Sequence, residues 1–349
     1  MTVSDATCAT VGREGGGALW HRVAILLVTA LTVAAQGTVA PALPAAQGDF
    51  AGLVDIGGRR LYLECQGTGD PTVVLEDGAG LGADVWSVDL VEPAQPRPMV
   101  LPTVAGFTRV CAYDRPGVTL SVNPATHPPA LADRPFPSRS DPAPMPRAAA
   151  DVVADLHALL QAASVPGPYV LGGHSFGGLV VRLYASTYPD EVVGLVLVDA
   201  ANEETYPAWA ALLGPMRWAE IMARTQQPPE GLEGYQDFER LDVNASVAQG
   251  RRARASQPLQ PMPLAVLTHG RPFEALVPDW PSDAFERMWL GQQQDLATLV
   301  PNARLTIASQ SGHAIQQDQP ALVTEAIRQV VTGVRAPDTW YDLVSCCTP

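Results

Sequence analysis

The stretch "YVLGGHSFGGLVVRLYA", residues 169–185, changes its pattern at the midpoint. Its first three residues are apolar and predict the end of a buried strand. From Phe176 onward the apolar residues recur at the spacing of a helix. Between the two lies "GHSFG", residues 173–177, so Ser175 is placed at the centre of a strand-to-helix turn.

A serine in such a turn is suited to nucleophilic chemistry. The strand-to-helix turn holds the hydroxyl in a strained, accessible position, and the flanking glycines prevent clashes with neighbouring side chains. The N-terminus of the following helix favours developing negative charge. The alternative is an ordinary helix cap, since serine is a common N-cap residue. The strand before Ser175 and the helix after it favour the G-x-S-x-G nucleophile elbow.

The rest of the chain alternates between apolar strands and helices. Strands without polar alternation, separated by helices, predict an α/β fold with a mostly parallel sheet covered by helices on both faces. Residues 201–261 interrupt the alternation and are too hydrophobic for a linker, so we expect a helical cap insertion there. The proline-rich stretch 123–147 predicts a long loop without regular structure.

The composition excludes several functions. The 349 residues include 36 acidic and 22 basic residues, and all basic residues are arginines. Without lysine, Schiff-base chemistry and a lysine-dependent phosphate loop are excluded. A net charge of −14 without basic clusters makes nucleic acid an unsuitable partner. No cysteine or histidine spacing indicates a metal, and nothing indicates an organic cofactor.

The N-terminus has the pattern of a signal peptide. Arginines precede the uncharged apolar run 23–35, and small residues suited to cleavage follow it, so the cleavage site is expected between 35 and 46. The run is short for a membrane span, although an uncleaved anchor remains the alternative. We therefore predict a signal peptide in 1–35, a mature domain in 36–349, secretion, and no stable membrane span after processing.

Five segments occur in an order that resembles the α/β-hydrolase family, of the serine ester-hydrolase type. They are "LEDGAG", "AYDRPG", "GGHSFGG", "LVLVDA" and "SGHAIQQDQP", and the resemblance runs from about residue 50 to 333. It implies a triad in the chain order serine, acid, histidine. His313, which follows the last predicted strand, fits the base, and His269 at the end of an earlier strand is the alternative.

The acid departs from the commonest pattern of that family. Many relatives carry an Asp after the strand that here reads "PLAVLTHG", but the only nearby carboxylate there is Glu274. Asp199 closes the apolar run "VVGLVLVDA", and a carboxylate in that position needs a partner such as His313. We therefore favour Asp199 over Glu274, with a loop-capping Asp as the structural alternative.

Two backbone N–H groups are needed to bind the oxyanion. The elbow places one at Phe176, and the turn after "TVVLE" supplies the other, which we assign to Ala79. The neighbouring pair Asp114-Arg115 is expected to tie loops together and is left outside the site.

These residues predict an exported enzyme that cleaves carboxylic esters through an acyl-enzyme. The expected partner is a small-molecule ester with an apolar part. Trp209, Met216 and Trp218 of the insertion suggest a pocket for it, and packing between the cap and the core explains these residues equally well. A lactonase, a peptidase or a C–C bond hydrolase would use the same triad, and a non-catalytic binding protein could keep the same fold.

The cysteines leave one pairing open. The resemblance makes the strands of Cys65 and Cys111 neighbours, which allows either a disulfide or two buried free thiols. Nothing in the sequence explains the adjacent Cys346 and Cys347.

Overall fold

The computed structural model describes residues 48–126 and 130–342. The predicted signal peptide, His127 and the pair Cys346-Cys347 lie outside the described residues. Among the described residues, no helix is long and apolar enough to cross a membrane.

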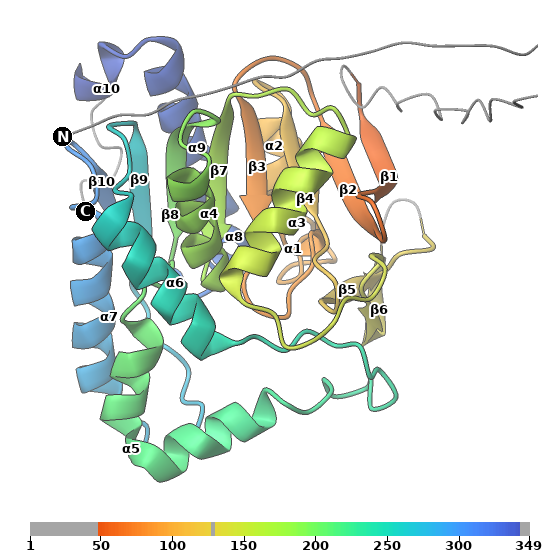
Figure 1. The fold of residues 1–349 in the computed structure, drawn as a ribbon, viewed down its shortest axis with the longest axis vertical. Coiled ribbons are helices and arrows are strands. Elements are labelled where there is room, and N and C mark those ends of the chain that lie inside the picture. Colours follow the sequence, from red (N-terminus) through yellow and green to blue (C-terminus); the bar gives the residue numbers. More distant parts are fainter. Residues whose placement is uncertain (1–47, 127–129, 343–349) are drawn as a thin grey trace, which may run out of the picture. The chain divides into compact units, whose positions relative to one another are not determined.

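The elements alternate between strand and helix along most of the chain (Figure 1). The strands are β1 (Phe50–Asp55), β2 (Arg60–Gln66), β3 (Thr72–Glu76), β4 (Val110–Tyr113), β5 (Thr119–Asn123), β6 (Ala130–Pro137), β7 (Tyr169–His174), β8 (Val192–Val198), β9 (Leu264–His269) and β10 (Arg304–Ala308). The helices are α1 (Asp84–Ser87), α2 (Val100–Val104), α3 (Ala149–Ala162), α4 (Phe176–Thr187), α5 (Thr205–Arg224), α6 (Val243–Ser256), α7 (Ser282–Leu296), α8 (Ile315–Asp318), α9 (Pro320–Arg335) and α10 (Thr339–Asp342).

Eight strands form one sheet in the order β1-β2-β4-β3-β7-β8-β9-β10. The β1–β2 and β2–β4 pairs are antiparallel, and every later pair is parallel. The carboxyl ends of the parallel strands therefore meet at one edge of the sheet, where loops can bring side chains together. The prediction of a mostly parallel sheet is confirmed.

The strands are apolar throughout because alternate side chains enter two separate cores. In β8, Leu195 and Leu197 pack in the core with α3 and α4, whereas Val196 and Val198 pack in the core with α2 and α9. Figure 1 shows these helix pairs on opposite faces of the sheet. A strand buried on both faces has no solvent side, and so it shows no polar alternation.

The insertion between β8 and β9 contains two helices with different packing. Helix α5 bends at Gly214, whose φ is 74°, and Pro215 follows inside the helix. Helix α6 instead packs against α4, and its Gly250 lies so close to Leu179 that an added Cβ would stand 2.8 Å from Cδ1. Within the predicted cap insertion 201–261, α6 therefore packs with the helical layer over the sheet. We use the name cap for α5 and the segment 225–242.

The expectation of an irregular loop over 123–147 is wrong in part. Residues 130–137 form β6, which pairs with β5 in a separate two-stranded sheet. Pro135 and Pro137 are tolerated because the strand has a neighbour on one side only, which leaves one edge without ladder hydrogen bonds. Proline content alone therefore misled the prediction.

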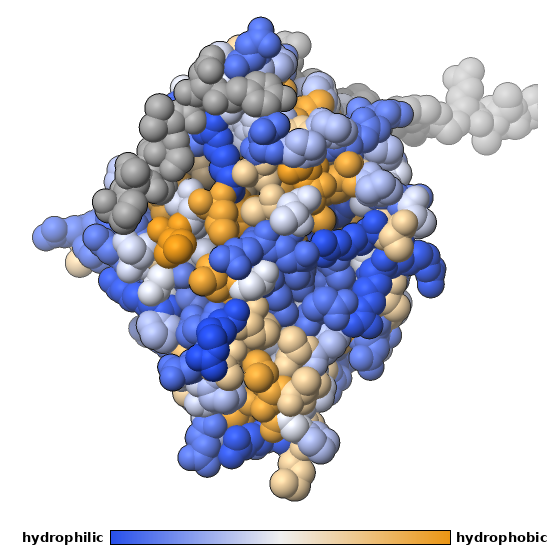
Figure 2. Space-filling view, turned by 90° about the vertical axis from the view of Figure 1, so that its left-hand side faces the viewer, coloured by the Kyte–Doolittle hydropathy of each residue, from blue (hydrophilic) through white to orange (hydrophobic). Residues whose placement is uncertain are grey.

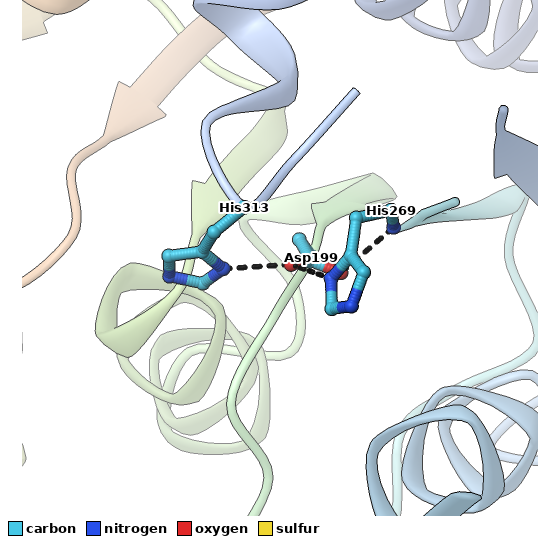
Figure 3. A group of neighbouring side chains, drawn as sticks. All are labelled: Asp199, His269 and His313. Carbon is cyan, nitrogen blue, oxygen red and sulfur yellow. Dashed lines mark hydrogen bonds and ion pairs between the residues drawn. The ribbon is translucent and has the colours of Figure 1, made fainter. Parts of the chain in front are cut away.

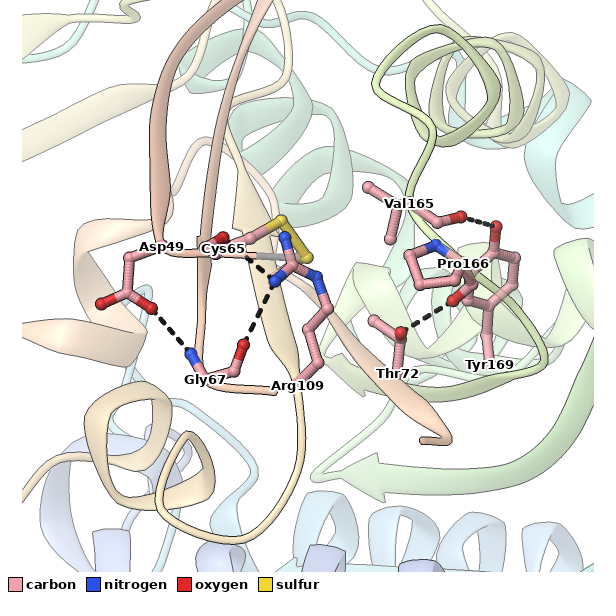
Figure 4. The surroundings of a disulfide bond; sticks show 10 residues. Asp49, Cys65, Gly67, Thr72, Arg109, Val165, Pro166 and Tyr169 are labelled. Carbon is pink, nitrogen blue, oxygen red and sulfur yellow. Dashed lines mark hydrogen bonds between the residues drawn. A yellow bond between two sulfur atoms is a disulfide. The ribbon is translucent and has the colours of Figure 1, made fainter. Parts of the chain in front are cut away.

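The open question of the cysteines is answered by a disulfide between Cys65 and Cys111. The two residues face each other directly in the antiparallel pair of β2 and β4, with their Cα atoms 4.0 Å apart. That distance lies just below the range usual for disulfides. Arg109 lies beside the bond and donates to the carbonyl of Gly67 at 3.1 Å (Figure 4).

Candidate active site

Ser175 lies in the turn between β7 and α4, as the sequence predicts. Its backbone has φ 52° and ψ −121°, a left-handed conformation that non-glycine residues rarely adopt. The turn is held by two hydrogen bonds to the next strand region, from Ser175 N to Val198 O at 3.2 Å and from Ala201 N to Ser175 O at 2.8 Å. Backbone strain of this kind persists only where the surroundings enforce it, and it is common at functional sites.

The glycines on both sides of Ser175 are required by close backbone approaches. A Cβ on Gly173 would stand 2.6 Å from Gly177 O, and a Cβ on Gly177 would stand 2.6 Å from Asp77 O. The second contact shows that the turn after β3 packs directly on the elbow. The same packing brings that turn to Ser175, because a Cβ on Gly78 would lie 3.2 Å from the serine Cβ.

Asp199 and His313 meet beside the elbow. Asp199 follows β8, the strand next to β7, and His313 lies in the loop between β10 and α8. His313 Nδ1 lies 2.6 Å from Asp199 Oδ2, and the side chain of the aspartate is fully buried. Burial disfavours the charge, but hydrogen bonds from His269 and His313 hold the pKa of Asp199 below its usual range. An ionised Asp199 can therefore accept a hydrogen bond from His313 Nδ1–H.

The two alternative residues of the sequence analysis, Glu274 and His269, have surroundings that differ from those of Asp199 and His313. Glu274 is exposed in the segment after β9 and makes no hydrogen bond to His313. His269 does contact Asp199, but it lies on the other side of the carboxylate from His313 (Figure 3). Its Nε2 points to Glu286 Oε2 at 2.9 Å. Of the two histidines, His313 is the more exposed, with 27% of its side chain accessible against 2% for His269.

His174, the residue before the serine, packs against His313 and contacts its backbone. Its Nε2 lies 3.1 Å from the backbone oxygen of His313, and the two rings pack at 4.7 Å between centroids. Burial, together with the proximity of His313, lowers the pKa of His174 to about 3. A neutral imidazole can donate Nε2–H to that carbonyl, so His174 fixes the loop that carries His313.

The turn of residues 77–80 carries the second predicted oxyanion donor. Ala79 is exposed there and lines the same cavity as Ser175. Within the described part of the chain, its N–H makes no hydrogen bond to another protein group. Phe176 opens α4, so its N–H lies at the N-terminus of that helix. Both groups stay the predicted oxyanion donors.

Two charged residues that the sequence analysis did not include in the site, Arg115 and Glu239, hold this turn by hydrogen bonds. Arg115 donates to Gly78 O at 2.7 Å and to Asp77 O at 3.0 Å. Glu239, from the cap segment, accepts from Gly80 N at 2.7 Å and pairs with Arg115 Nε at 2.7 Å. The ion pair is buried, with each side chain 2% exposed. The motif "YDRPG" could have suggested Arg115, but Glu239 carries no local signal in the sequence.

A cavity of about 660 Å³ opens at Ser175. Its other walls come largely from the cap and are mostly apolar; they include Trp209, Trp218, Ile221 and Phe238. The expectation of an apolar pocket therefore holds for both tryptophans but is wrong for Met216, which is 86% exposed. Figure 2 shows apolar side chains at the lower end of the molecular face that it displays, at the level of α5 in Figure 1.

Asp199, His269 and His313 are also residue types that bind metals, and their ligand atoms lie within 4.8 Å of one another. However, both Nδ1 atoms lie 2.6 Å from the same carboxylate oxygen, which is hydrogen-bond distance. A nitrogen that donates a proton has no lone pair for a metal. The geometry is that of a hydrogen-bonded group.

Several known proteins are similar to this chain in sequence or in fold. The chain is 26% identical over 329 residues to the probable transporter efuK of Hormonema carpetanum, which covers 82% of this chain but only 43% of that protein. It is 25% identical over 265 residues to the uncharacterized protein YqjL of Bacillus subtilis, covering 76% of this chain and 85% of the relative. The haloalkane dehalogenase DatA of Agrobacterium tumefaciens superposes with a TM-score of 0.53 at 15% identity, over 84% of this chain and 99% of the other, and so shares the fold.

The family model described as "Alpha/beta hydrolase family" matches residues 73–326, which include all but the first residue of β3, the elbow, Asp199 and His313. That match covers well over half of the chain, and the strand order agrees with it. The chain belongs to the α/β hydrolase family.

Proposed function

We propose that this protein is a serine hydrolase that cleaves carboxylic esters. The single observation that carries the proposal is that Ser175, in a strained elbow after β7, and the buried Asp199, after the neighbouring β8, lie at one sheet edge, with the imidazole of His313 hydrogen-bonded to Asp199. A serine hydroxyl needs an adjacent base, and the base needs a third group that orients it. These three residues fill those roles in the chain order serine, acid, histidine.

The reaction would run in two halves. Ser175 Oγ attacks the ester carbonyl carbon while His313 takes the hydroxyl proton, and the negative oxygen is bound by the N–H groups of Phe176 and Ala79. The tetrahedral intermediate collapses, and His313 returns the proton to the departing alcohol. A water molecule then attacks the acyl-serine, again losing its proton to His313, and collapse releases the acid and restores Ser175.

The identity of the nucleophile separates this proposal from other reactions on the same fold. Haloalkane and epoxide hydrolases of this fold use an aspartate at the elbow, and this chain has Ser175 there. An alkoxide formed from serine attacks acyl carbon through a tetrahedral intermediate that the two N–H groups can stabilise. Acyl transfer is therefore the favoured reaction class.

The cavity supports an ester with an apolar part. Trp218, Ile221 and Phe238 line it together with Ser175, so an acyl or alcohol chain bound there would be removed from water. Burying such a chain contributes about 25 cal/mol for each Å² of apolar surface.

Export remains part of the proposal. The predicted signal peptide in 1–35 is supported by the Cys65–Cys111 disulfide, since disulfides persist in oxidising compartments. Detection of the mature chain outside the cytoplasm, beginning between residues 36 and 47, would support it. A full-length protein retained in the cytoplasm would contradict it.

The test is hydrolysis of p-nitrophenyl esters of increasing acyl length, with fluorophosphonate labelling as a second readout. We expect turnover and labelling at Ser175 in the wild type and neither in Ser175→Ala, because the hydroxyl forms the covalent intermediate. Ser186 lies outside the elbow on the same helix, α4, and Ser186→Ala is the control that should preserve both turnover and labelling. Turnover in Ser175→Ala near the wild-type rate would contradict the proposal, and a folded wild type without turnover or labelling would favour a binding protein.

A further inference from the structure

Asp199 is shared by two histidines, and the hydrolytic mechanism uses only one of them. His269 Nδ1 and His313 Nδ1 both lie 2.6 Å from Asp199 Oδ2, from opposite sides of the carboxylate (Figure 3). A triad needs a single imidazole on its acid. The second imidazole, buried at the end of β9, therefore requires its own explanation.

The other oxygen of Asp199 is also occupied. Oδ1 accepts from Trp289 Nε1 at 2.8 Å, from His269 N at 3.0 Å and from Thr268 Oγ1 at 3.3 Å. An ionised carboxylate accepts about four hydrogen bonds, so Asp199 is saturated with donors. A buried carboxylate held by so many donors stays ionised and has one orientation.

The far side of His269 is bound by a second carboxylate. Its Nε2 lies 2.9 Å from Glu286 Oε2, and Glu286 Oε1 accepts from Phe273 N at 2.7 Å. An ionised carboxylate only accepts, so an imidazole that donates Nδ1–H to Asp199 must also carry a proton on Nε2 to bond Glu286. The His269 ring is thus placed as a buried cation between two anions.

The electrostatics agree with this geometry. Burial works against the cation, but hydrogen bonds and charges of Asp199 and Glu286 raise the pKa of His269 above its ordinary value. The titratable groups that face this cluster in the described structure are Asp199 after β8, Glu286 on α7, His313 before α8 and His174 at the end of β7.

We propose, on the basis of the serine-hydrolase function above, that His269 and Glu286 are positioning residues. They hold Asp199 on the side away from His313, and the negative charge of Asp199 is then shared between His269 and His313. The His269 cation draws part of the aspartate's charge away from the base. His313 therefore faces a carboxylate whose charge a second cation already compensates in part. The pair would extend ester hydrolysis to lower pH.

The test compares His269→Asn and Glu286→Gln with the wild type. An Asn amide can replace the Nδ1 donor without carrying charge, and Gln at 286 removes the distal anion. Asp283→Asn is the matched control, because Asp283 is an exposed carboxylate on the same helix. The readouts are the pH profile of kcat/KM and the ring ¹⁵N–¹H resonances of His269.

For the wild type, we expect both ring nitrogens of His269 to carry protons at neutral pH. In Glu286→Gln, the Nε2 proton should be lost at lower pH than in the wild type. The acid limb of kcat/KM should move upward by about one pH unit in His269→Asn and by less in Glu286→Gln. Asp283→Asn should leave both readouts unchanged.

If the His269→Asn and Glu286→Gln variants have a lower yield or thermal stability but the acid limb of their kcat/KM profiles does not move, His269 and Glu286 have only a structural role. That result would overturn the proposal. A singly protonated His269 in the folded wild type would also overturn it. If His269→Asn does not fold, Glu286→Gln makes the same prediction, since its side chain is 30% exposed and tolerant of change. A wild type that lacks Ser175 labelling would contradict the hydrolase function instead, and the protonation of His269 would still be read by the resonances.

Discussion

The floor and the roof of the Ser175 cavity are built in opposite ways. The floor carries residues at the ends of sheet strands: Ser175 after β7 and the turn after β3 line the cavity, and the fully buried Asp199 follows the neighbouring β8. The roof is a kinked helix and an irregular segment, and α5 has few buried residues (Thr205, Leu213 and Ile221). The hydrogen-bonded strands hold residues at their ends in fixed positions, whereas the sequence of the cap can change without disturbing the sheet. The chemistry should therefore depend on the floor, and the choice of substrate on the roof.

The largest expected effect concerns His313, the proposed base, whose ring contacts Asp199. His313→Ala should lower kcat for a p-nitrophenyl ester by about 10⁵–10⁶-fold, since a serine without its base is a poor nucleophile. His157→Ala is the control, because His157 stacks on Tyr188 in the helical layer at 4.0 Å between ring centroids. Steady-state kinetics would measure both. A loss of less than tenfold for His313→Ala would remove this residue from the triad.

The next effect distinguishes the two candidate acids. Asp199→Asn should lower kcat by about 10⁴-fold, because an amide favours the wrong imidazole tautomer of His313. Glu274→Gln should stay within about tenfold, since Glu274 is exposed and does not contact His313. Circular dichroism of both variants checks that they are folded. The reverse ranking would return the acid to the commoner position of the family.

A smaller effect separates stability from chemistry within the sheet itself. Replacing both Cys65 and Cys111 by alanine should lower the free energy of unfolding by about 2–4 kcal/mol. Because β2 and β4 lie outside the elbow, kcat/KM at moderate temperature should change by less than about threefold. Urea unfolding and ester kinetics on the same preparation would measure the two quantities. A large loss of kcat/KM would show that the bond also supports the site.

The roof should affect selectivity by about a factor of ten. Trp218→Ala should lower kcat/KM for long-chain esters about tenfold relative to acetate, because it removes apolar surface from the cavity wall. Met216→Ala is the matched control on the same helix, since Met216 is exposed and does not line the cavity. Equal effects on acetate and long-chain esters would contradict the division between floor and roof.

The smallest effect is a pH-dependent difference in stability. Folding raises the pKa of His269, so its ion pair with Glu286 stabilises the native state fully below the unfolded pKa, near 6.5. That contribution declines as the pH rises through the higher native value. Glu286→Gln should therefore be less stable than the wild type by about 1 kcal/mol or less at pH 5.5, and the difference should shrink at pH 9. Thermal unfolding at the two pH values tests the sign.

The sequence predicts the floor well because each of its parts has a local signal. Ser175 lies in a pentapeptide between a strand pattern and a helix pattern, and Asp199 ends an apolar run. His313 follows the last strand pattern, and parallel strands bring all three ends to one edge. The roles of these residues stay predictions until they are measured.

The supporting contacts could not be predicted in the same way. Glu239 contacts Arg115 from 124 residues away in the sequence, and Glu286 on helix α7 contacts His269 at the end of strand β9. Such pairs depend on how α7 and the cap segment pack, and neither periodicity nor a turn signal encodes that packing. The strand β6 was missed for a related reason, since its only partner is β5 in a small separate sheet.

The disulfide has a topological consequence for the site. Cys65 and Cys111 close a covalent ring that contains β3 and the turn with Ala79, while Ser175, Asp199 and His313 all lie outside it. A single cut in the exposed stretch 91–96 would therefore leave one connected molecule under oxidising conditions. After reduction, the fragment that carries the oxyanion turn could separate from the fragment that carries the triad. An extracellular protease and a reductant would then have to act together to divide the active site.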